Sequence, residues 1–277
     1  MSFRIATNVP SLQARRSLRR TDQETTKTFA SLSTGSRINS SADDAAGLAI
    51  SEKLKATIKS NKQADRNAND GISMIQVAEG GLNEVSTILI RLRELAIQSS
   101  SDTIGETERE YTDMEYQQMK LELQRISETT KFNDNNLLDG HGQMLDFQIG
   151  MRNNDFQDRI VYDVGKINVG LEALELTDLT TKDKLSAQSS LDTVDAAIEN
   201  VSGQRAILGA LQNRLITTSD NLQTGIENFS AAQSRIRDTD YAEATADLTR
   251  NNILSQAGTA VLSQANSSPS GALRLIG

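Results

Sequence analysis

Apolar residues recur every seven positions over a long stretch that begins near residue 50. One row runs from Leu54 to Ala96 and a companion row from Ile50 to Leu92, with small or polar members in the first half of each. This spacing is typical of a helix that buries one seam in a coiled-coil-like contact. At about 1.5 Å per residue such a helix is about 70 Å long, so it needs equally long partners.

Two further helical stripes supply those partners. A second heptad row runs from Ala187 to Ile236, and steps of four and three between Thr112 and Ile126 indicate a shorter helix. Three stripes of this kind can close on one another as a bundle. We expect the seam of this bundle to include Leu82, Leu89, Leu92, Leu208, Leu215 and Leu222.

The period changes to two between the second and third of these stripes in the chain. Apolar residues alternate at Leu145, Phe147 and Ile149 and again at Ile160, Tyr162 and Val164. The polar run RNND lies between the two groups, and the turn-rich FNDNNLLDGHG precedes them. The pattern predicts a small β-hairpin region at about residues 130–180, attached to a helical body.

The two ends of the chain carry thinner stripes. Leu18 and Leu32 are two heptads apart with Phe29 near them, and Leu254 and Val261 lie on one face of the last segment. Helices this weakly apolar need packing partners, so we expect the ends to pair with each other. The fold class is therefore mainly α: an elongated coiled-coil-like helical bundle with a small hairpin region and paired terminal helices. The expected domains are residues 1–42 with 236–277, and residues 43–235.

Composition agrees with long helices and restricts the function. Aromatic residues make up 4% of the 277 residues, Trp is absent and there are two Pro. The net charge of -8 and the pI of about 4.9 argue against a surface built to bind phosphate backbones. No apolar run is long enough for a signal peptide or a membrane span, so an exported chain would use a route without signal cleavage.

Candidate catalytic and metal-binding residues are few. With one His and no Cys, the His-based triads, the two-His zinc helix and thiol catalysis are unavailable. His141 lies in a Gly-flanked turn and is expected at the surface, whereas the adjacent Asp43 and Asp44 fit the start of a helix. We therefore expect no catalytic site, no cofactor and no metal site.

One cluster of basic residues has three possible interpretations. A nucleic-acid or membrane patch, a solvated helix face, and pairing with acidic residues near the other end of the chain are all compatible with it. The cluster comprises Arg15, Arg16, Arg19 and Arg20, and the acidic residues are Asp238, Asp240, Glu243 and Asp247. We favour contacts made during assembly.

Several long motifs, in order, resemble those of bacterial flagellins. They are SLSTGSRINSSADDAAGLAISEKL, NANDGISMIQVAEGGLNEV, RLRELAIQSS and RIRDTDYAEATADLTRNNILSQAGTAVLSQAN, and the resemblance covers essentially the whole chain. It implies an inner coiled-coil domain made by both ends around a central channel, surrounded by a helical domain with a β-hairpin. Only ELTDLTTKDKLS connects the hairpin region to the last long helix, so the chain resembles short flagellins without outer variable domains.

The resemblance implies a structural subunit and no enzyme. Such a chain is exported unfolded through the flagellar type III secretion channel, polymerises into the extracellular filament and serves swimming motility. Its implied partners are other copies of itself, an export chaperone, and cap and junction proteins; nucleic acid binding and membrane insertion are not expected. Alternatives are a hook–filament junction protein, and an interaction module such as an immune-receptor ligand or adhesin.

The resemblance also assigns contact residues. Arg91, Leu95 and Glu115 match flagellin positions that a Toll-like receptor recognises and that contribute to subunit contacts. The terminal helices are expected to order on assembly, because neighbouring subunits and the N-terminal partner would bury the stripe of the tail. The terminal residues expected to act in assembly are Leu18, Phe29, Leu32, Leu254 and Val261.

Overall fold

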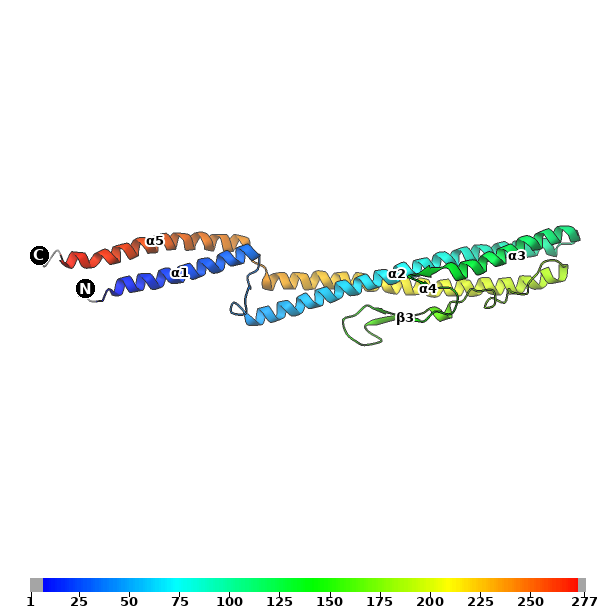
Figure 1. Ribbon diagram of the computed structural model, residues 1–277, viewed down its shortest axis with the longest axis horizontal. Helices are drawn as coiled ribbons and strands as arrows, with labels where there is room; N and C mark the ends of the chain where they lie inside the picture. Colours follow the sequence, from blue (N-terminus) through cyan, green and yellow to red (C-terminus); the bar gives the residue numbers. More distant parts are fainter. Residues whose placement is uncertain (1–6, 274–277) are drawn as a thin grey trace. The chain divides into compact units, whose positions relative to one another are not determined.

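Helices and two short hairpins make up residues 7–273, the part of the chain that the computed structural model describes (Figure 1). The helices are α1 (Val9–Thr34), α2 (Ala45–Ser100), α3 (Glu106–Thr129), α4 (Lys184–Arg237) and α5 (Tyr241–Leu273). The strands are β1 (Lys131–Phe132), β2 (Asn135–Asn136), β3 (Met144–Gln148) and β4 (Arg159–Asp163), followed by a 3-10 turn at Val164–Lys166. The fold is mainly α with a small β-hairpin region, as the sequence predicted.

The chain divides into two compact units. One joins residues 1–56 with 228–277, and the other comprises residues 57–227. Helices α2 and α4 each run continuously through both units. The first unit therefore contains α1, α5 and one end of each long helix, whereas α3 and both hairpins belong to the second.

In the first unit, α1 and α5 lie side by side (Figure 1). Asn8 caps α1 by accepting a hydrogen bond from the Ser11 N–H at 3.0 Å. Gly35 ends α1 with a φ of 70°, a left-handed conformation that glycine adopts without strain. No residue of α1 is fully buried, so this helix depends on a thin contact.

The connections α1–α2 and α4–α5 are bound to each other, and we call residues 35–44 and 237–240 the paired connections. Ser36 and Asp238 form an antiparallel bridge, and the Arg37 N–H donates to the Arg237 carbonyl at 2.6 Å. Ile38 is 2% exposed. The two connections are thus held together by backbone hydrogen bonds beside one buried apolar side chain.

The start of α2 follows the predicted capping pattern but shifts its seam. Asp44 Oδ1 accepts a hydrogen bond from the Gly47 N–H at 2.8 Å, which confirms a helix-start role for this carboxylate. Gly47 lies so close to Ile38 that an added Cβ would come 2.7 Å from Ile38 Cδ1. The seam here uses Ser51, which is fully buried, and Ile50 is 52% exposed, so the prediction that Ile50 belongs to the companion row is wrong.

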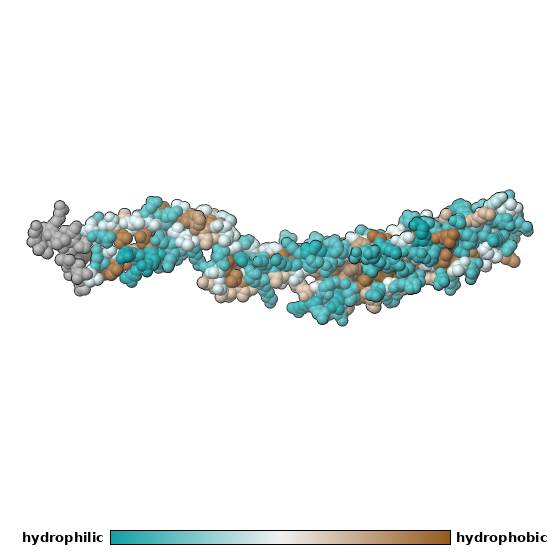
Figure 2. Space-filling model, viewed as in Figure 1, coloured by the Kyte–Doolittle hydropathy of each residue, from teal (hydrophilic) through white to brown (hydrophobic). Residues whose placement is uncertain are grey.

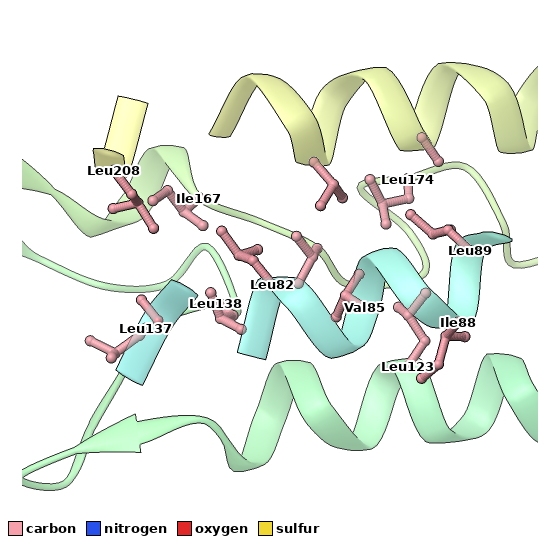
Figure 3. Close-up of a cluster of buried hydrophobic side chains, with 14 of the residues drawn as sticks. Leu82, Val85, Ile88, Leu89, Leu123, Leu137, Leu138, Ile167, Leu174 and Leu208 are labelled. Carbon is pink, nitrogen blue, oxygen red and sulfur yellow. The ribbon is translucent and has the colours of Figure 1, made fainter. Parts of the chain in front are cut away.

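The core of the second unit lies between α2, α3 and α4 (Figure 3). The cluster includes Leu82 and Leu89 of α2, Leu123 of α3 and Leu208 of α4, and these four side chains have no exposed surface. Burial of each such leucine contributes about 1.5–3 kcal/mol. Segments outside the helices add Leu137, Leu138, Ile167 and Leu174.

The hairpin region contains two sheets. β3 and β4 pair antiparallel with Leu145 opposite Tyr162, so the predicted alternation is confirmed. Their connection is the ten-residue segment 149–158, which contains the RNND run that the sequence indicated as a turn. In the β1–β2 hairpin, Asn133 and Asp134 have φ of 48° and 64°. Positive φ at both central residues is what a two-residue type I′ turn requires.

Candidate subunit-contact surfaces

The seam between α1 and α5 is built from small and half-buried residues. A Cβ on Gly258 would lie 3.2 Å from Leu18 Cδ1, so the two helices approach closely at this level. Leu32 is half-buried, and Ala244 is 8% exposed. Because few large apolar side chains are buried here, the hydrophobic stabilisation of this pair within one chain is small.

Polar contacts fix the far end of the same pair. Asn8 Nδ2 donates to the Ala265 carbonyl at 2.8 Å, and Ser11 Oγ donates to Asn266 Oδ1 at 2.7 Å. The first contact is made by the N-cap of α1 and the second by its first turn. They set the register of the two helices, although exposed hydrogen bonds of this kind add little net stability.

The apolar stripe of the C-terminal segment lies on the exposed side of α5. Ile253, Leu254 and Val261 are 62%, 50% and 59% exposed, whereas Leu262 is half-buried. The N-terminal segment therefore does not cover Leu254 and Val261, and the part of the prediction that assigned their burial to it is wrong. Within one chain this stripe is open.

Helix α1 also presents apolar side chains to solvent. Val9 and Leu12 are 45% and 49% exposed, and Phe29 is 65% exposed. Figure 2 shows apolar patches on the visible face of the α1–α5 pair. Large exposed apolar patches typically mark interaction surfaces. Both helices of the pair thus offer surface to a partner.

A polar surface joins α2 to α3 in the second unit. Arg91 donates from Nε and Nη2 to Glu115 Oε1 at 2.9 Å and 2.7 Å, and from Nη1 to Glu94 at 2.9 Å. Hydrogen bonding to Glu115, then to Glu94, raises the pKa of Arg91 above its usual value. Arg91 and Glu115 are both accessible, but Leu95 is 1% exposed. The expectation that Leu95 lies on this contact surface is wrong, because its side chain belongs to the core.

Further apolar residues, which the sequence analysis missed, lie exposed on the second unit. On α3, Tyr111, Met114 and Leu121 are 65%, 60% and 60% exposed, and on α2 Ile90 and Ile97 are 51% and 47% exposed. Met114 and Leu121, like Ile90 and Ile97, are seven residues apart. A second heptad row outside the main seam was the signal that could have found them.

The expected seam residues occupy the following places. Leu82, Leu89, Leu92, Leu208 and Leu215 have no exposed surface. Leu222 is half-buried. They hold the bundle together and offer no side-chain surface to a partner, apart from the accessible part of Leu222.

The connection into α4 is bound tightly to α3. Asp113 Oδ1 accepts hydrogen bonds from the Thr181 N–H and the Thr180 hydroxyl, both at 2.8 Å, and Lys120 Nζ donates to the Thr177 carbonyl at 2.8 Å. Burial alone would raise the pKa of Asp113, but the hydrogen bonds from Thr181 and Thr180 hold it below its usual value. Residues 171–183 therefore lead directly from the hairpin region to α4.

Asp43 organises the α1–α2 connection. Its Oδ2 accepts hydrogen bonds from the N–H groups of Asn39 and Ser40 at 3.2 Å and 3.0 Å, and its Oδ1 lies 3.1 Å from Lys27 Nζ on α1. The hydrogen bond with Lys27, followed by those of Ser40 and Asn39, lowers the pKa of Asp43 to about 2. The carboxylate thus links α1 to the paired connections.

The basic cluster and the acidic residues are apart. Among the described residues, none of the four arginines forms an ion pair, and Asp247 pairs instead with Arg250 at 2.5 Å. Within the described part of one chain, the two groups therefore do not pair. All four members of the basic cluster are exposed: Arg15, Arg16, Arg19 and Arg20.

The described residues offer little that could act in catalysis or metal binding. His141 is exposed and lies beside Asp139, whose carbonyl is 2.9 Å from His141 Nδ1. Within residues 7–273, no three His, Cys, Asp or Glu side chains are grouped so as to hold a metal ion. In the same residues, none of the helices combines the length and hydropathy needed to cross a bilayer.

Comparison with protein families identifies this helical arrangement. The family model of the bacterial flagellin N-terminal helical region matches residues 5–143, and that of the C-terminal helical region matches residues 191–276. The chain belongs to the bacterial flagellin family. It is 44% identical over 271 residues to a flagellin of Halalkalibacterium halodurans, covering 97% of this chain and 98% of the relative. With a Bacillus subtilis flagellin the identity is 39% over 306 residues, covering 99% and 100%.

Solved structures agree in fold. The crystal structure of Bacillus cereus flagellin has 28% sequence identity and a TM-score of 0.51, covering 61% of this chain and 94% of that one. A structure described as a flagellar hook-associated protein from Vibrio parahaemolyticus has a TM-score of 0.58 at 12% identity, covering 71% and 100%. The second likeness concerns the fold alone. This flagellin is a filament subunit of the short form, which lacks outer variable domains.

Proposed function

We propose that this flagellin is exported unfolded through the flagellar type III channel, polymerises into an extracellular filament, serves swimming motility and catalyses no reaction. In this proposal, residues 1–42 with 236–277 form the inner coiled-coil domain, and residues 43–235 form the bundle domain with its hairpin region. The observation that carries the polymerisation is the open apolar stripe of α5. One chain leaves Ile253, Leu254 and Val261 exposed by half or more.

Polymerisation supplies what the isolated chain lacks. Burying apolar surface contributes about 25 cal/mol per Å², so several copies packed along α1 and α5 gain stability that one thin pair does not have. Leu18, Leu32 and Phe29 on α1, with Leu254 and Val261 on α5, are the proposed assembly residues. Contacts between unlike surfaces of successive copies generate an open helical filament when the rotation from one copy to the next does not close a ring.

The test compares the full chain with a chain that lacks residues 234–277. Both are purified, unfolded, renatured and examined by sedimentation and electron microscopy. We expect filaments from the full chain and a folded helical monomer from the truncated one, because the core cluster lies entirely between Ala68 and Leu215. Circular dichroism verifies that the truncated chain is folded. Filaments from the truncated chain would contradict the role of the tail.

Arg91 and Glu115 are a proposed contact surface for neighbouring subunits and for a Toll-like receptor. Support comes from the exposure of both side chains, 46% and 43%, and from the motif RLRELAIQSS. Export chaperone, cap and junction proteins are further proposed partners. An Arg91→Ala variant tests the surface: receptor-reporter activity and filament yield should both fall, while Lys59→Ala, an exposed control on the same helix, should leave both unchanged.

A further inference from the structure

Two clusters of opposite charge on the α1–α5 pair lack partners in the described chain. The basic cluster, Arg15 to Arg20, is on α1. What we call the acidic cluster lies at the opposite end of the pair and comprises Glu243 of α5 with Asp238 and Asp240 of the connection that leads into α5. All these side chains are exposed, and none forms an ion pair within residues 7–273. Each cluster is thus available to a partner.

The register of the two helices keeps the clusters apart. Asn8 contacts Ala265, Leu18 packs at Gly258, and Tyr241 lies beside Leu32, where its hydroxyl donates to the carbonyl at 3.4 Å. This antiparallel register places the basic cluster opposite residues 256–261 of α5. At about 1.5 Å per residue, the acidic cluster is about 25 Å further along the axis.

The clusters also lie on different flanks of the pair. Arg19 follows the seam residue Leu18 by one position, whereas Glu243 precedes the seam residue Ala244 by one. Each step turns the side chain by about 100° around its helix, and in an antiparallel pair these opposite displacements point to opposite flanks. One flank is therefore basic near one end, and the other is acidic near the other end.

We propose that the acidic cluster of one copy binds the basic cluster of a second copy displaced by about 25 Å along the helix axis. This contact rests on the proposed polymerisation, and it specifies the axial displacement between neighbouring copies. A flank that binds the opposite flank of the next copy makes a heterologous contact, and because each copy is displaced along the axis, the contact repeats without closing a ring. The occupant is a second copy because the same chain carries both complementary surfaces.

The contact between the two clusters determines the axial displacement of neighbouring copies more than the strength of their association. Individual exposed ion pairs contribute about 0–1 kcal/mol and are screened by salt, so they do not drive polymerisation alone. Copies displaced wrongly would place like charges together, which is strongly unfavourable. The open apolar stripe of α5 supplies attraction along the same helix, and the charges select one displacement.

Charge reversal tests the contact in the full-length chain. One variant carries Arg16→Glu and Arg19→Glu, and another carries Asp238→Lys and Glu243→Lys; Asp240 is kept because its Oδ1 accepts the Ala242 N–H that begins α5. Each variant alone should raise the critical concentration for polymerisation at least about tenfold. An equimolar mixture should co-assemble near the wild-type concentration, because each reversed cluster then meets its complement.

Controls separate this contact from general charge effects. Lys59→Glu with Lys62→Glu makes the same net change as the arginine variant at exposed positions in the second unit, and it should polymerise like the wild type. Electron cryo-microscopy of wild-type filaments should show neighbouring α1–α5 pairs offset by about 25 Å with the two clusters in contact.

The outcomes are distinct. Wild-type filaments together with unchanged assembly of both reversed variants would overturn the contact but not the proposed function. Loss of assembly in each variant without rescue in the mixture would also overturn the contact. In that case, binding of the wild type to anionic vesicles or to DNA, lost in the arginine variant, would assign the basic cluster to those ligands. If the wild type forms no filaments, the proposed function and this contact both fail.

Discussion

Leu18 of α1 packs where Gly258 of α5 has no side chain, and an added Cβ would lie 3.2 Å from Leu18 Cδ1. Glycine inside a helix costs about 0.5–1 kcal/mol relative to alanine, so its presence here is explained by the close approach of the helices. Few large side chains are buried elsewhere between α1 and α5. The stability of the pair therefore depends strongly on this contact.

Gly258→Leu should separate the two helices and impair polymerisation. The larger side chain would displace Leu18, and we expect the critical concentration to rise at least about tenfold, corresponding to a loss of about 1–3 kcal/mol from overpacking. Gly209→Ala on α4 is the matched control, because nothing lies within 4 Å of an added Cβ there. That variant should polymerise normally and gain up to about 1 kcal/mol of stability in denaturant unfolding. Normal assembly of Gly258→Leu would show that the close approach is dispensable.

Leu89→Asp should unfold the bundle, whereas Arg91→Ala should spare it. Leu89 has no exposed surface, and a buried, unpaired carboxylate costs several kcal/mol, a large share of a stability of about 5–15 kcal/mol. Arg91→Ala loses only the exposed ion pairs with Glu94 and Glu115, which solvent screens and which add little to the stability of the fold. Thermal melting followed by circular dichroism distinguishes them. An Arg91→Ala protein that melts as early as Leu89→Asp would place Arg91 in the core.

Asp113→Ala should release the connection into α4. Asp113 is 3% exposed and its carboxylate holds the Thr181 N–H, so removal leaves a buried donor unsatisfied at a cost of about 1–3 kcal/mol. Amide exchange at Thr181 should accelerate while the core of the bundle stays protected. Glu122→Ala on the same helix, whose partner Arg125 is exposed, should change neither measurement. Unchanged exchange at Thr181 in Asp113→Ala would argue against this anchor.

The heptad rows predicted most of the fold because burial at a helix seam repeats in sequence. Leu82 and Leu89 lie in the core for that reason. Ile50 was misplaced because Ile38, which lies outside the heptad rows, packs on Gly47, so the face of α2 that carries Gly47 and Ser51 is the buried one. Such a contact depends on the three-dimensional path of a connection, which periodicity does not encode.

The contact surfaces were less predictable. Leu95 belongs to two patterns, a family motif and the helical core, and the core pattern decides where its side chain lies. Leu254 and Val261 formed the apparent stripe, yet α1 packs on the smaller residues beside Gly258, since close approach favours small side chains. Which face of a thin amphipathic helix meets its partner depends on the fit between helices, and hydropathy alone does not specify it.

Acid should weaken the paired connections through Asp43. The pKa of Asp43 is about 2 in the folded chain and 3.8 for the unperturbed group. Because the folded value is the lower one, the stabilisation is fully present above about pH 4 and is lost as the pH falls toward 2. Amide exchange at Asn39 and Ser40 should accelerate across that interval. In Asp43→Asn it should be faster already at neutral pH and lack this pH dependence, and an identical profile in both proteins would exclude Asp43 as the cause.

Polymerisation should protect α1 and α5 far more than it protects the paired connections. In the free chain, the helices are held by a thin seam with an open apolar stripe, so their amides should exchange rapidly. Arg37 donates to the Arg237 carbonyl at 2.6 Å beside the buried Ile38, so its amide should already be slow in the monomer. Hydrogen exchange with mass spectrometry, on monomer and on filaments, measures both segments. Equal protection of α1 and α5 in the two states would mean that the pair is stable alone, and ordering would not be coupled to assembly.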